Sequence, residues 1–455
     1  MSTWCPDLAG FSGPKYQAVA DALARAVAEG YLHPGDRLPP QRALAARLGF
    51  DLTTITRAYD LARERGLIVA RGRAGSFVRE ARGGNVPDLA PLVTGSGMNC
   101  PPLAEDGLFQ RAMCETLPEL LTARNVACLQ YQRPGGAPDV RRAGAMLLAR
   151  AGFPSNEDQV ILTAGGQNAL HAILHATTRK GDRVACAQFV YPGFRTLARR
   201  LSLELVPLPE MTAEALRQAN SAGKIQALYV VPTNNNPTTE TIGLAQRKAL
   251  AELARAEGIA VIEDDAYALL ADDPIAPIGS FAPECSWYIL SMSKVISPAL
   301  RVAFARAPGV SKALQLAAEV HETAVMAPPL NAAVVARWLA DGRFEQIVAA
   351  TRAEAAARQR LAREILAPAR HAGHPQGYHI WLELPRGIRA GDLSQVLNAH
   401  GLDSVSSDRF AVASRGTEAL RITLGGVQNR DRLAAGLRVL EGNLGAALER
   451  WDVLV

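Results

Sequence analysis

Lys294 lies in a short motif whose residues could react with a carbonyl compound. It closes the sequence Ser291-Met292-Ser293-Lys294, which directly follows an apolar run, and Arg301 stands seven residues later. A lysine amine must lose its proton before it forms a Schiff base with an aldehyde, and a site beside positive charge and away from bulk water lowers its pKa enough. The two serines and the arginine could also neutralise a phosphate. A Ser-x-Ser-Lys sequence is usually a surface feature, but its place after a buried run favours a site.

Carboxylates and a tyrosine follow another apolar run, in Glu263-Asp264-Asp265-Ala266-Tyr267. A carboxylate at a strand end can hold the protonated pyridine nitrogen of pyridoxal 5′-phosphate (PLP), and a tyrosine three residues later can bond the ring hydroxyl. If this motif stood alone, an acidic loop that caps a helix would be the default interpretation. Together with the lysine motif, it favours a PLP site.

Amides and glycines could complete such a site. An amide within Asn234 to Asn236 can donate to the ring hydroxyl, and Pro237 makes the turn that aims it rigid. Gly165-Gly166 opens a predicted helix, where a backbone without Cβ atoms can close on a phosphate. The alternatives are an ordinary Asn/Pro loop and an ordinary turn.

Short apolar runs that alternate with helical segments would position these motifs. Continuous apolar strands between helices are typical of a mostly parallel sheet that is buried on both faces, and ligands bind beyond the carboxyl ends of such strands. The motifs above stand at those ends. The runs are Val160 to Leu162, Arg183 to Cys186, Ala227 to Val231, Ile259 to Ile262 and Ser286 to Leu290.

The first eighty residues have a different pattern, that of three helices followed by a hairpin. The predicted elements are helices over Tyr16 to Glu29, Gln41 to Leu48 and from about Asp51–Thr53 to Gly66, and β-runs over Leu67 to Ala70 and Ser76 to Val78. This arrangement is that of a winged helix-turn-helix, although a small helical subdomain with a solvated basic face has the same periodicity.

In a winged helix, the first turn of the third helix enters the major groove of DNA. It would present Thr53, Thr54, Thr56 and Arg57, whose hydroxyl and guanidinium groups can bond base edges or phosphates. The predicted backbone contacts are Arg42 on the preceding helix and, in the wing turn, Gly72 and Arg73.

Composition and charge agree with a two-part protein. A chain of 455 residues with 48% hydrophobic and 20% charged residues is too long for one ordinary core and too apolar to be disordered. Residues 1–82 hold 12 Lys/Arg against 8 Asp/Glu, and the remainder 37 against 36, so most of the net charge of +5 lies at one end. The six cysteines are too far apart in the chain to suggest a zinc site or a disulfide framework. With no signal peptide or membrane-length apolar run, we expect a cytoplasmic protein without a membrane partner.

The N-terminal motifs resemble those of the GntR-type DNA-binding domain. The resemblance covers Pro34-Gly35-Asp36-Arg37-Leu38-Pro39, Arg42, Leu44-Ala45, Thr54, Arg57-Ala58-Tyr59, Gly66-Leu67 and the wing sequence Gly-x-x-Gly-x-Phe-Val. Leu52 departs from it, since many relatives have a basic or polar residue there. The resemblance implies binding to double-stranded operator DNA.

The remaining motifs resemble fold-type I, PLP-dependent class I aminotransferases over about residues 98–440. The ordered set is Gly166-Gln167, Tyr191-Pro192-Gly193, Asn236-Pro237-Thr238, Asp264-x-x-Tyr267, Ser291-x-Ser293-Lys294 and Arg301. Thr239, Ala187-Gln188-Phe189 and Ala303 depart from the family pattern, but none of these departures removes a group that would touch the cofactor.

The resemblance implies a role for each matching residue. Lys294 would form the Schiff base with PLP, Asp264 would pair with the ring nitrogen, Tyr191 would stack on the ring, and Asn236 and Tyr267 would contact the ring oxygen. The implied phosphate cradle consists of Gly166, Gln167, Ser291, Ser293 and Arg301. Tyr131 resembles the tyrosine that reaches the phosphate of a partner subunit, and Arg421 the arginine that clamps a substrate carboxylate.

The two halves together resemble the MocR-like subgroup of GntR regulators, whose members are typically head-to-tail homodimers. This implies an α/β architecture with a winged helix at residues 1–80, a linker at 81–97, and an aminotransferase-like domain at 98–455 whose large part covers about 130–320 and small part about 340–455. The effector would be PLP or an amino compound. Two alternatives stay open: a true aminotransferase with an auxiliary DNA-binding domain, and a regulator whose retained domain is empty.

Overall fold

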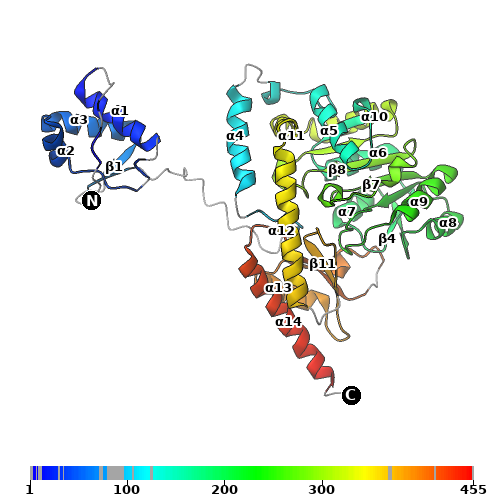
Figure 1. Cartoon of the computed structure of the whole chain (residues 1–455). Coiled ribbons are helices and arrows are strands. Elements are labelled where there is room, and N and C mark those ends of the chain that lie inside the picture. The colour runs from blue at the N-terminus through cyan, green and yellow to red at the C-terminus, as the bar shows by residue number, and fades with distance from the viewer. Residues whose placement is uncertain are drawn as a thin grey trace. The chain divides into compact units, whose positions relative to one another are not determined.

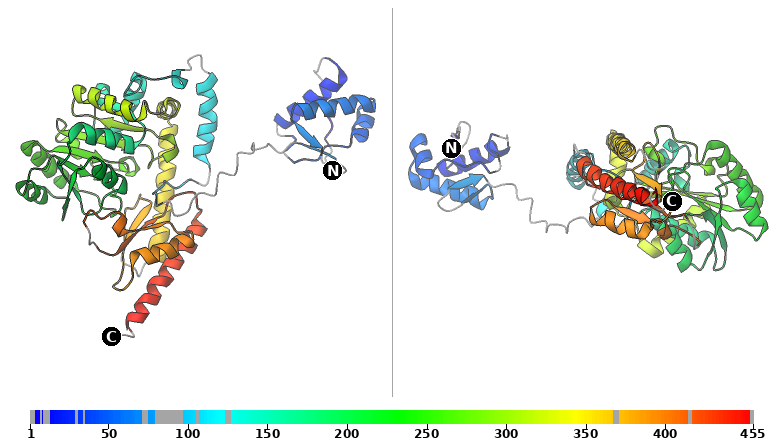
Figure 2. Two further views of the ribbon diagram at one scale, coloured as in Figure 1. Left: turned by 180° about the vertical axis from the view of Figure 1, so that it is seen from behind. Right: turned by 90° about the horizontal axis from the view of Figure 1, so that it is seen from below.

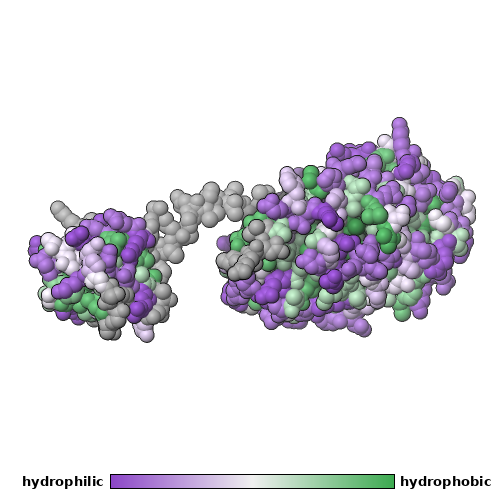
Figure 3. Space-filling model, turned by 90° about the horizontal axis from the view of Figure 1, so that it is seen from above, coloured by the Kyte–Doolittle hydropathy of each residue, from purple (hydrophilic) through white to green (hydrophobic). Residues whose placement is uncertain are grey.

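A computed structural model divides the chain into two compact units, residues 1–93 and 94–455 (Figures 1 and 2). It describes residues 4–6, 8, 13–28, 31–33, 35–70, 75–78, 97–104, 107–122, 127–366, 371–413 and 417–452. Most of the predicted linker therefore lies outside the described residues. Hydrophilic residues cover most of the face of each unit that Figure 3 shows. Within the described ranges, no helix is long and apolar enough to cross a membrane.

The first unit is a winged helix. It contains α1 (Lys15–Ala28), α2 (Gln41–Leu48), α3 (Leu52–Glu64) and an antiparallel pair, β1 (Ile68–Ala70) and β2 (Ser76–Val78). Leu23, Leu44, Ile55 and Tyr59 are almost fully buried in its core, and the Tyr59 hydroxyl donates to the Pro39 carbonyl at 2.7 Å. The apolar stripes expected for the three helices therefore form one common core.

A seven-stranded sheet forms the centre of the second unit. Its strands are β3 (Val160–Thr163), β4 (Arg183–Ala187), β5 (Glu204–Leu208), β6 (Ala227–Val230), β7 (Ala260–Asp264), β8 (Ser286–Ser291) and β9 (Ala303–Arg306). They lie in the order β3-β9-β8-β7-β6-β4-β5, and only β9 runs antiparallel to its two neighbours. The predicted α/β fold with a mostly parallel sheet is confirmed.

Helices cover both faces of this sheet because alternate strand residues enter different cores. Ile161 and Cys186 pack with α6 and α10, whereas Leu162 packs with α5 and α11 and Ala185 with α8 and α9 on the opposite side. The helices are α5 (Pro138–Arg150), α6 (Gly166–Thr177), α7 (Pro192–Arg200), α8 (Ala213–Ser221), α9 (Leu244–Glu257), α10 (Val310–Ala324) and α11 (Pro329–Asp341). Single-turn 3-10 helices lie at Ala127–Leu129, Glu157–Gln159, Ala268–Leu270, Ile278–Ser280, Pro298–Leu300 and Ser407–Arg409.

A smaller α+β part follows the long helix α12 (Arg343–Ile365), drawn in yellow in Figure 1. Its antiparallel strands β10 (His371–Gly373), β11 (His379–Glu383), β12 (Ser404–Ser406) and β13 (Ala419–Thr423) lie in the order β10-β11-β13-β12. The helix α13 (Ala390–Ala399) packs on β12 and β13, and α14 (Arg430–Asp452) packs on α12 and α13. β13 carries Arg421 into the interior.

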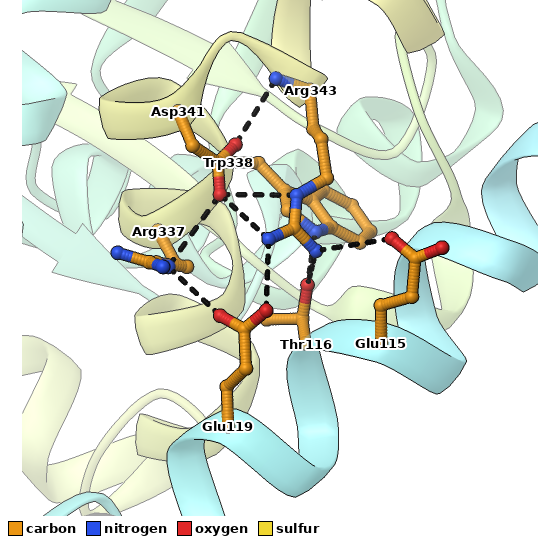
Figure 4. A network of polar contacts seen from close by, with 7 residues as sticks. All are labelled: Glu115, Thr116, Glu119, Arg337, Trp338, Asp341 and Arg343. Atoms are coloured by element: carbon orange, nitrogen blue, oxygen red, sulfur yellow. Dashed lines mark hydrogen bonds and ion pairs between the residues drawn. The ribbon is translucent and has the colours of Figure 1, made fainter.

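A polar network attaches α4 (Leu108–Thr122) to the junction of α11 and α12 (Figure 4). The buried hydroxyl of Thr116 accepts hydrogen bonds from Trp338 Nε1 at 2.8 Å and from Arg343 Nη1 at 2.6 Å. Arg343 also pairs with Glu119 and Asp341, at 3.2 and 2.9 Å. This network holds the helix that follows residues 97–104, a segment that reaches the cavity described below.

We expect Thr116→Val to destabilise the second unit by about 1–3 kcal/mol, because the substitution leaves the buried Nε1 of Trp338 without its acceptor and removes one bond of the partly exposed Arg343. Differential scanning calorimetry of the full chain should show a lower melting temperature for the second unit and no change for the winged helix. Thr196→Val, on the exposed side of α7, is the matched control. Equal melting temperatures of the second unit in the Thr116 and Thr196 variants would contradict the role given to the network.

Candidate functional site

A cavity lies at the carboxyl edge of the large sheet, beyond the ends of β3, β4, β6, β7 and β8. Ten of the residues predicted for a cofactor site line it: Gly166, Gln167, Tyr191, Asn236, Asp264, Tyr267, Ser291, Ser293, Lys294 and Arg301. Met98, Leu170, Val231, Ala266 and Pro298 complete the lining. The structure therefore gathers side chains from segments that are far apart in the sequence.

Lys294 lies just beyond β8 at the wall of this cavity. Its Nζ donates to the backbone carbonyl of Asn99 at 2.5 Å. Burial lowers the pKa of the amine to about 8, and the positive charges of Arg421 and Arg301 act in the same direction. At this pKa about a tenth of the amine is neutral, and nucleophilic, at pH 7, far more than for an ordinary lysine.

Only the middle one of three consecutive acids lines the cavity. Glu263 accepts from the backbone N–H groups of Ile278 and Gly279, and Asp265 accepts from the hydroxyls of Thr233 and Tyr288, so both are used inside the fold. Burial raises the pKa of Asp264 to about 6, and the Tyr229 hydroxyl donates to it at 3.1 Å. A cation beside Asp264 would favour its ionised form.

Tyr267 is held in place by two residues that we did not predict. Asn99 Nδ2 donates to the Tyr267 hydroxyl at 2.9 Å and lies 3.1 Å from Nδ1 of His379. His379 is fully buried, and burial lowers its pKa to about 3, so the ring is neutral. Asn99 stands at the end of a Pro/Gly-rich stretch without periodicity, so no local signal pointed to it.

One end of the cavity collects hydrogen-bond donors. It contains the N-terminus of α6 at Gly166, the hydroxyls of Ser291 and Ser293, and the guanidinium of Arg301. Arg301 has a left-handed backbone, with φ of 51°, and donates to the Ala164 carbonyl at 3.0 Å. Gly165, with φ of 86°, allows this approach because a Cβ there would overlap Arg301. Such a set of donors suits a phosphate.

Tyr191 lines the cavity from the start of α7, and burial raises the pKa of its hydroxyl. Gly193 lies under its ring, where a Cβ would overlap both the ring and the Gln167 amide. The Gln167 Oε1 atom is buried and has no hydrogen-bond partner among the described residues. Gly193 is therefore required for the position of the ring.

Two other residues predicted for the site do not line the cavity. Arg421 is almost fully buried directly behind it, where Nη1 donates to Asn236 Oδ1 at 3.2 Å and Nη2 to the Gly97 carbonyl at 2.7 Å. Its Nε has no hydrogen-bond partner in the described part of the chain. Tyr131 is 83% exposed on the surface.

In the winged helix, the predicted DNA-contacting residues differ in their surroundings. Arg42, Thr53 and Arg57 are exposed and Thr54 is half-buried. The Arg57 guanidinium lies over the ring of Tyr16, 4.7 Å from its centroid. Gly72 and Arg73 lie outside the described residues.

Two of the threonine hydroxyls already have partners within this unit. Thr53 donates its hydroxyl and its N–H to Asp51, the N-cap of α3, at 2.5 and 2.7 Å. The Thr56 hydroxyl donates to Gln41 on α2 at 3.0 Å. Among the described residues of this unit, the side chains of Thr54 and Arg57 have no such hydrogen-bond partner, and Arg57 only stacks on Tyr16.

Comparisons with known proteins agree with both units. Residues 15–78 match the bacterial regulatory proteins of the gntR family, and residues 100–437 match aminotransferase class I and II. The chain is 29% identical to the uncharacterized HTH-type transcriptional regulator YdeF of Bacillus subtilis, over 96% of each chain. It is 26% identical to the vitamin B6 salvage pathway transcriptional repressor PtsJ of Salmonella typhimurium, over 90% of this chain and 94% of that one.

Enzymes are also similar to the second unit. A 2-aminoadipate transaminase of Thermus thermophilus is 28% identical over 75% of this chain and 87% of its own. The crystal structure of an archaeal alanine:glyoxylate aminotransferase superposes with a TM-score of 0.69 at 19% identity, over 77% of this chain and 90% of its own, which shows the shared fold.

The chain thus belongs to the aminotransferase class I and II family and carries a GntR-type DNA-binding domain ahead of it. This combination is that of the MocR-type regulators, which confirms the resemblance read from the motifs.

Substitutions of the adjacent glycines Gly165 and Gly166 test the close approach of Arg301 to the backbone at the donor-rich end of the cavity. We expect Gly165→Ala to destabilise the second unit by about 1–3 kcal/mol, because the new Cβ overlaps Arg301 and the positive φ disfavours alanine. Gly166→Ala, whose Cβ would lie an ordinary 3.5 Å from Ser291, should change stability by less than about 0.5 kcal/mol. Denaturant unfolding followed by circular dichroism measures both variants, and equal losses would contradict the close approach of Arg301.

Proposed function

We propose that the protein is a transcription regulator that binds PLP on Lys294 and binds operator DNA through its winged helix. The observation that carries this proposal is the cavity itself. A buried amine with a lowered pKa lies between a donor-rich end and a buried carboxylate, in a chain that begins with a DNA-binding domain.

The residues of the cavity fit PLP at each of its polar groups. The phosphate would meet the α6 N-terminus, Ser291, Ser293 and Arg301, all of which donate. The pyridine nitrogen would meet Asp264, whose burial raises its pKa and whose ionised form a cation would favour. The Gln167 Oε1 atom is buried without a hydrogen-bond partner among the described residues, and buried polar atoms normally have one. This supports a polar ligand in the cavity.

PLP supplies an electrophilic carbonyl carbon and an electron-withdrawing ring. Lys294 would hold that carbon covalently, and Asp264 would keep the proton on the ring nitrogen. Tyr267, oriented by Asn99, and Asn236 would contact the ring hydroxyl, while Tyr191 would cover the ring face. Arg421, which lies behind the cavity, would bind the carboxylate of an amino-compound effector, since a guanidinium can form two parallel bonds with a carboxylate.

The winged helix would contact bases with Thr54 and Arg57 and the phosphate backbone with Arg42. A homodimer would place two such units on paired half-sites and raise an otherwise modest affinity. The exposed Tyr131 supports this, because an aromatic side chain at 83% exposure is available to a second subunit. Because operator DNA would be its target, we expect the protein to act in the cytoplasm.

A second candidate function is transamination, because the amine, the acid and the donor-rich end all meet in one cavity and a transaminase is among the relatives. Steady-state assays with common amino and keto acids separate the two. Repeated turnover at about 1 per second or faster would favour the enzyme, whereas operator binding that changes with ligand and no turnover would favour the regulator.

Lys294→Ala should abolish the PLP adduct that borohydride traps, and Lys312→Ala, on the exposed side of α10, should leave it intact. Retention of the adduct in the Lys294 variant would refute the assignment. Absence of visible absorbance in the native chain, even with added PLP, would favour the empty-domain alternative.

Attachment of PLP should also depend on pH. Because only the neutral amine attacks a carbonyl, and the pKa of Lys294 is about 8, the attachment rate should rise about tenfold from pH 7 to pH 9 and then level off. Stopped-flow absorbance measures this rate. A rate still rising steeply at pH 10 would indicate an ordinary lysine pKa.

Arg57→Ala should weaken operator binding about tenfold without changing PLP absorbance, because it removes a guanidinium from the recognition helix. Arg63→Ala is the control, since Arg63 lies on the same helix and pairs with Asp60 at 2.8 Å. Electrophoretic mobility shifts measure both variants, and unchanged binding by the Arg57 variant would count against the role of α3.

A further inference from the structure

Three residues from different parts of the second unit form a chain of hydrogen bonds that ends at the cavity. His379 lies on β11 of the smaller part, Asn99 lies near the beginning of the unit, and Tyr267 follows β7 of the large sheet. His379 Nε2 lies 3.2 Å from the Asn235 carbonyl, and His379 Nδ1 lies 3.1 Å from Asn99 Nδ2. The same Asn99 nitrogen lies 2.9 Å from the Tyr267 hydroxyl. Of the three residues, only Tyr267 lines the cavity.

The position of the hydrogen on the His379 ring follows from the group that faces Nε2. The ring is fully buried and neutral, because burial and the positive charges of Arg421 and Lys294 lower its pKa to about 3, so it carries one hydrogen. The Asn235 carbonyl faces Nε2, and a carbonyl can only accept. The hydrogen therefore lies on Nε2, and Nδ1 is left as an acceptor.

An acceptor at Nδ1 determines how the Asn99 amide is turned. The atom that faces Nδ1 must be the amide nitrogen, because the amide oxygen would place two acceptors against each other. Turning the amide over would require the hydrogen on Nδ1, which would set a bare Nε2 against the Asn235 carbonyl and leave the amide nitrogen without a partner. The present orientation leaves only Asn99 Oδ1 without a partner among the described residues, and buried oxygens are left unpaired more often than buried N–H groups.

The orientation of Asn99 in turn decides the role of the Tyr267 hydroxyl. The Asn99 nitrogen has only hydrogens to offer, so the Tyr267 oxygen accepts, and the Tyr267 hydrogen serves another atom. The neighbouring Tyr378 hydroxyl donates to the Lys294 carbonyl at 2.9 Å, so it supplies no hydrogen to Tyr267. The Tyr267 hydrogen is therefore available to the Tyr378 oxygen or to an acceptor in the cavity.

We propose that His379 and Asn99 are positioning residues that make the Tyr267 hydroxyl a hydrogen-bond donor to the ring oxygen of PLP. This inference rests on the proposed function, because it takes the cavity as a PLP site. Asn236, the second residue expected at the ring oxygen, would act in the same way, since its Oδ1 accepts from Arg421 at 3.2 Å and its amide nitrogen stays a donor. Two donors favour a ring oxygen that carries no hydrogen.

The ligand-free full chain tests the first step. Nuclear magnetic resonance of histidine labelled with the heavy nitrogen isotope distinguishes a ring nitrogen that carries hydrogen from a bare one, and a His379→Asn variant identifies the signals of His379. We expect the hydrogen on Nε2 throughout pH 5 to pH 8, because the pKa of about 3 lies below this range. A hydrogen on Nδ1, or a charged ring within this range, would overturn the proposal.

Two phosphates without an aldehyde test the effect at Tyr267. Pyridoxine 5′-phosphate has the ring oxygen but cannot react with Lys294, and 3-deoxypyridoxine 5′-phosphate lacks the ring oxygen. Titration calorimetry of the full chain gives a Kd for each. The native chain should bind the first at least about tenfold more tightly, because a donor to an ionised oxygen makes a strong hydrogen bond. Equal Kd values would contradict a donor at this position.

Asn99→Asp separates positioning from packing. The carboxylate has nearly the shape of the amide but only accepts, so it would take the Tyr267 hydrogen for itself. The ratio of the two Kd values should fall about tenfold, to the ratio of Tyr267→Phe, and the two substitutions together should lower it no further. A merely structural role of Asn99 would weaken both phosphates equally and leave the ratio unchanged, and that result would refute the proposal.

The matched control is Asn429→Asp, at the exposed residue before α14. Its side-chain oxygen accepts from the Arg432 N–H at 3.0 Å, a bond that a carboxylate can also make, so this variant should keep the native ratio.

The same titrations distinguish the two levels of proposal. If neither phosphate binds to the native chain, the proposed ligand site is wrong and this inference is wrong with it. If both bind and the ratio does not respond to Asn99→Asp, the ligand site stands and only the role of His379 and Asn99 is refuted.

Discussion

The carboxyl ends of three neighbouring parallel strands, β6, β7 and β8, meet at one edge of the large sheet, and the chemistry of the protein depends on that meeting. Parallel strands are about 4.8 Å apart, so side chains that directly follow them lie within reach of one ligand. The register pairs Val230 with Glu263 and Asp264 with Ile289, and thereby sets the carboxylate of Asp264 beside the turn that holds Lys294. The sheet fixes where these segments end. The glycines Gly165 and Gly193 then leave the space that the Arg301 side chain and the Tyr191 ring occupy.

A buried polar layer beneath the cavity supports this edge. Arg247 is fully buried on α9 and donates to the carbonyls of Pro232, Ile242 and Ile275 and to the Thr233 hydroxyl. Thr233 in turn donates to Asp265. Arg247 therefore holds the turn after β6, and its positive charge also lowers the pKa of Asp265, the neighbour of Asp264. Removing one partner from such a network is costly, because the remaining charge stays buried and unpaired. The loop with Asn236 is therefore positioned by groups that never meet a ligand.

Segments with their own periodicity could be predicted from the sequence, and segments that depend on distant partners could not. The three helices of the winged unit and the strands that end at the cavity have apolar repeats and clear stop signals, and the structure confirms them within one or two residues. β5 and β9 were missed: β5 is an edge strand with half-exposed side chains and Pro207, and β9 has only four residues, two of them alanine. Gly97 was assigned to the linker, and Asn99 was assigned to the aminotransferase-like domain without a role at the site. The Gly97 contact uses a backbone carbonyl, which leaves no trace in side-chain patterns, and the partners of Asn99 are far away in the sequence. The contact of Thr56 with Gln41 depends on how α2 and α3 pack, which a single helical repeat does not determine.

The place of β9 between β3 and β8 has a consequence for biosynthesis. β3 pairs only with β9 among the strands of its sheet, so Val160–Thr163 has no strand partner until Ala303–Arg306 has left the ribosome. The winged helix, in contrast, closes its core within the first 78 residues. At ordinary translation speeds of about 5–20 residues per second, its fold can precede completion of the large sheet by on the order of 10–50 s. In each newly made chain the winged helix is thus folded for a time while the second unit is incomplete. Any contact of the winged helix with DNA during that time would not depend on a ligand of the second unit.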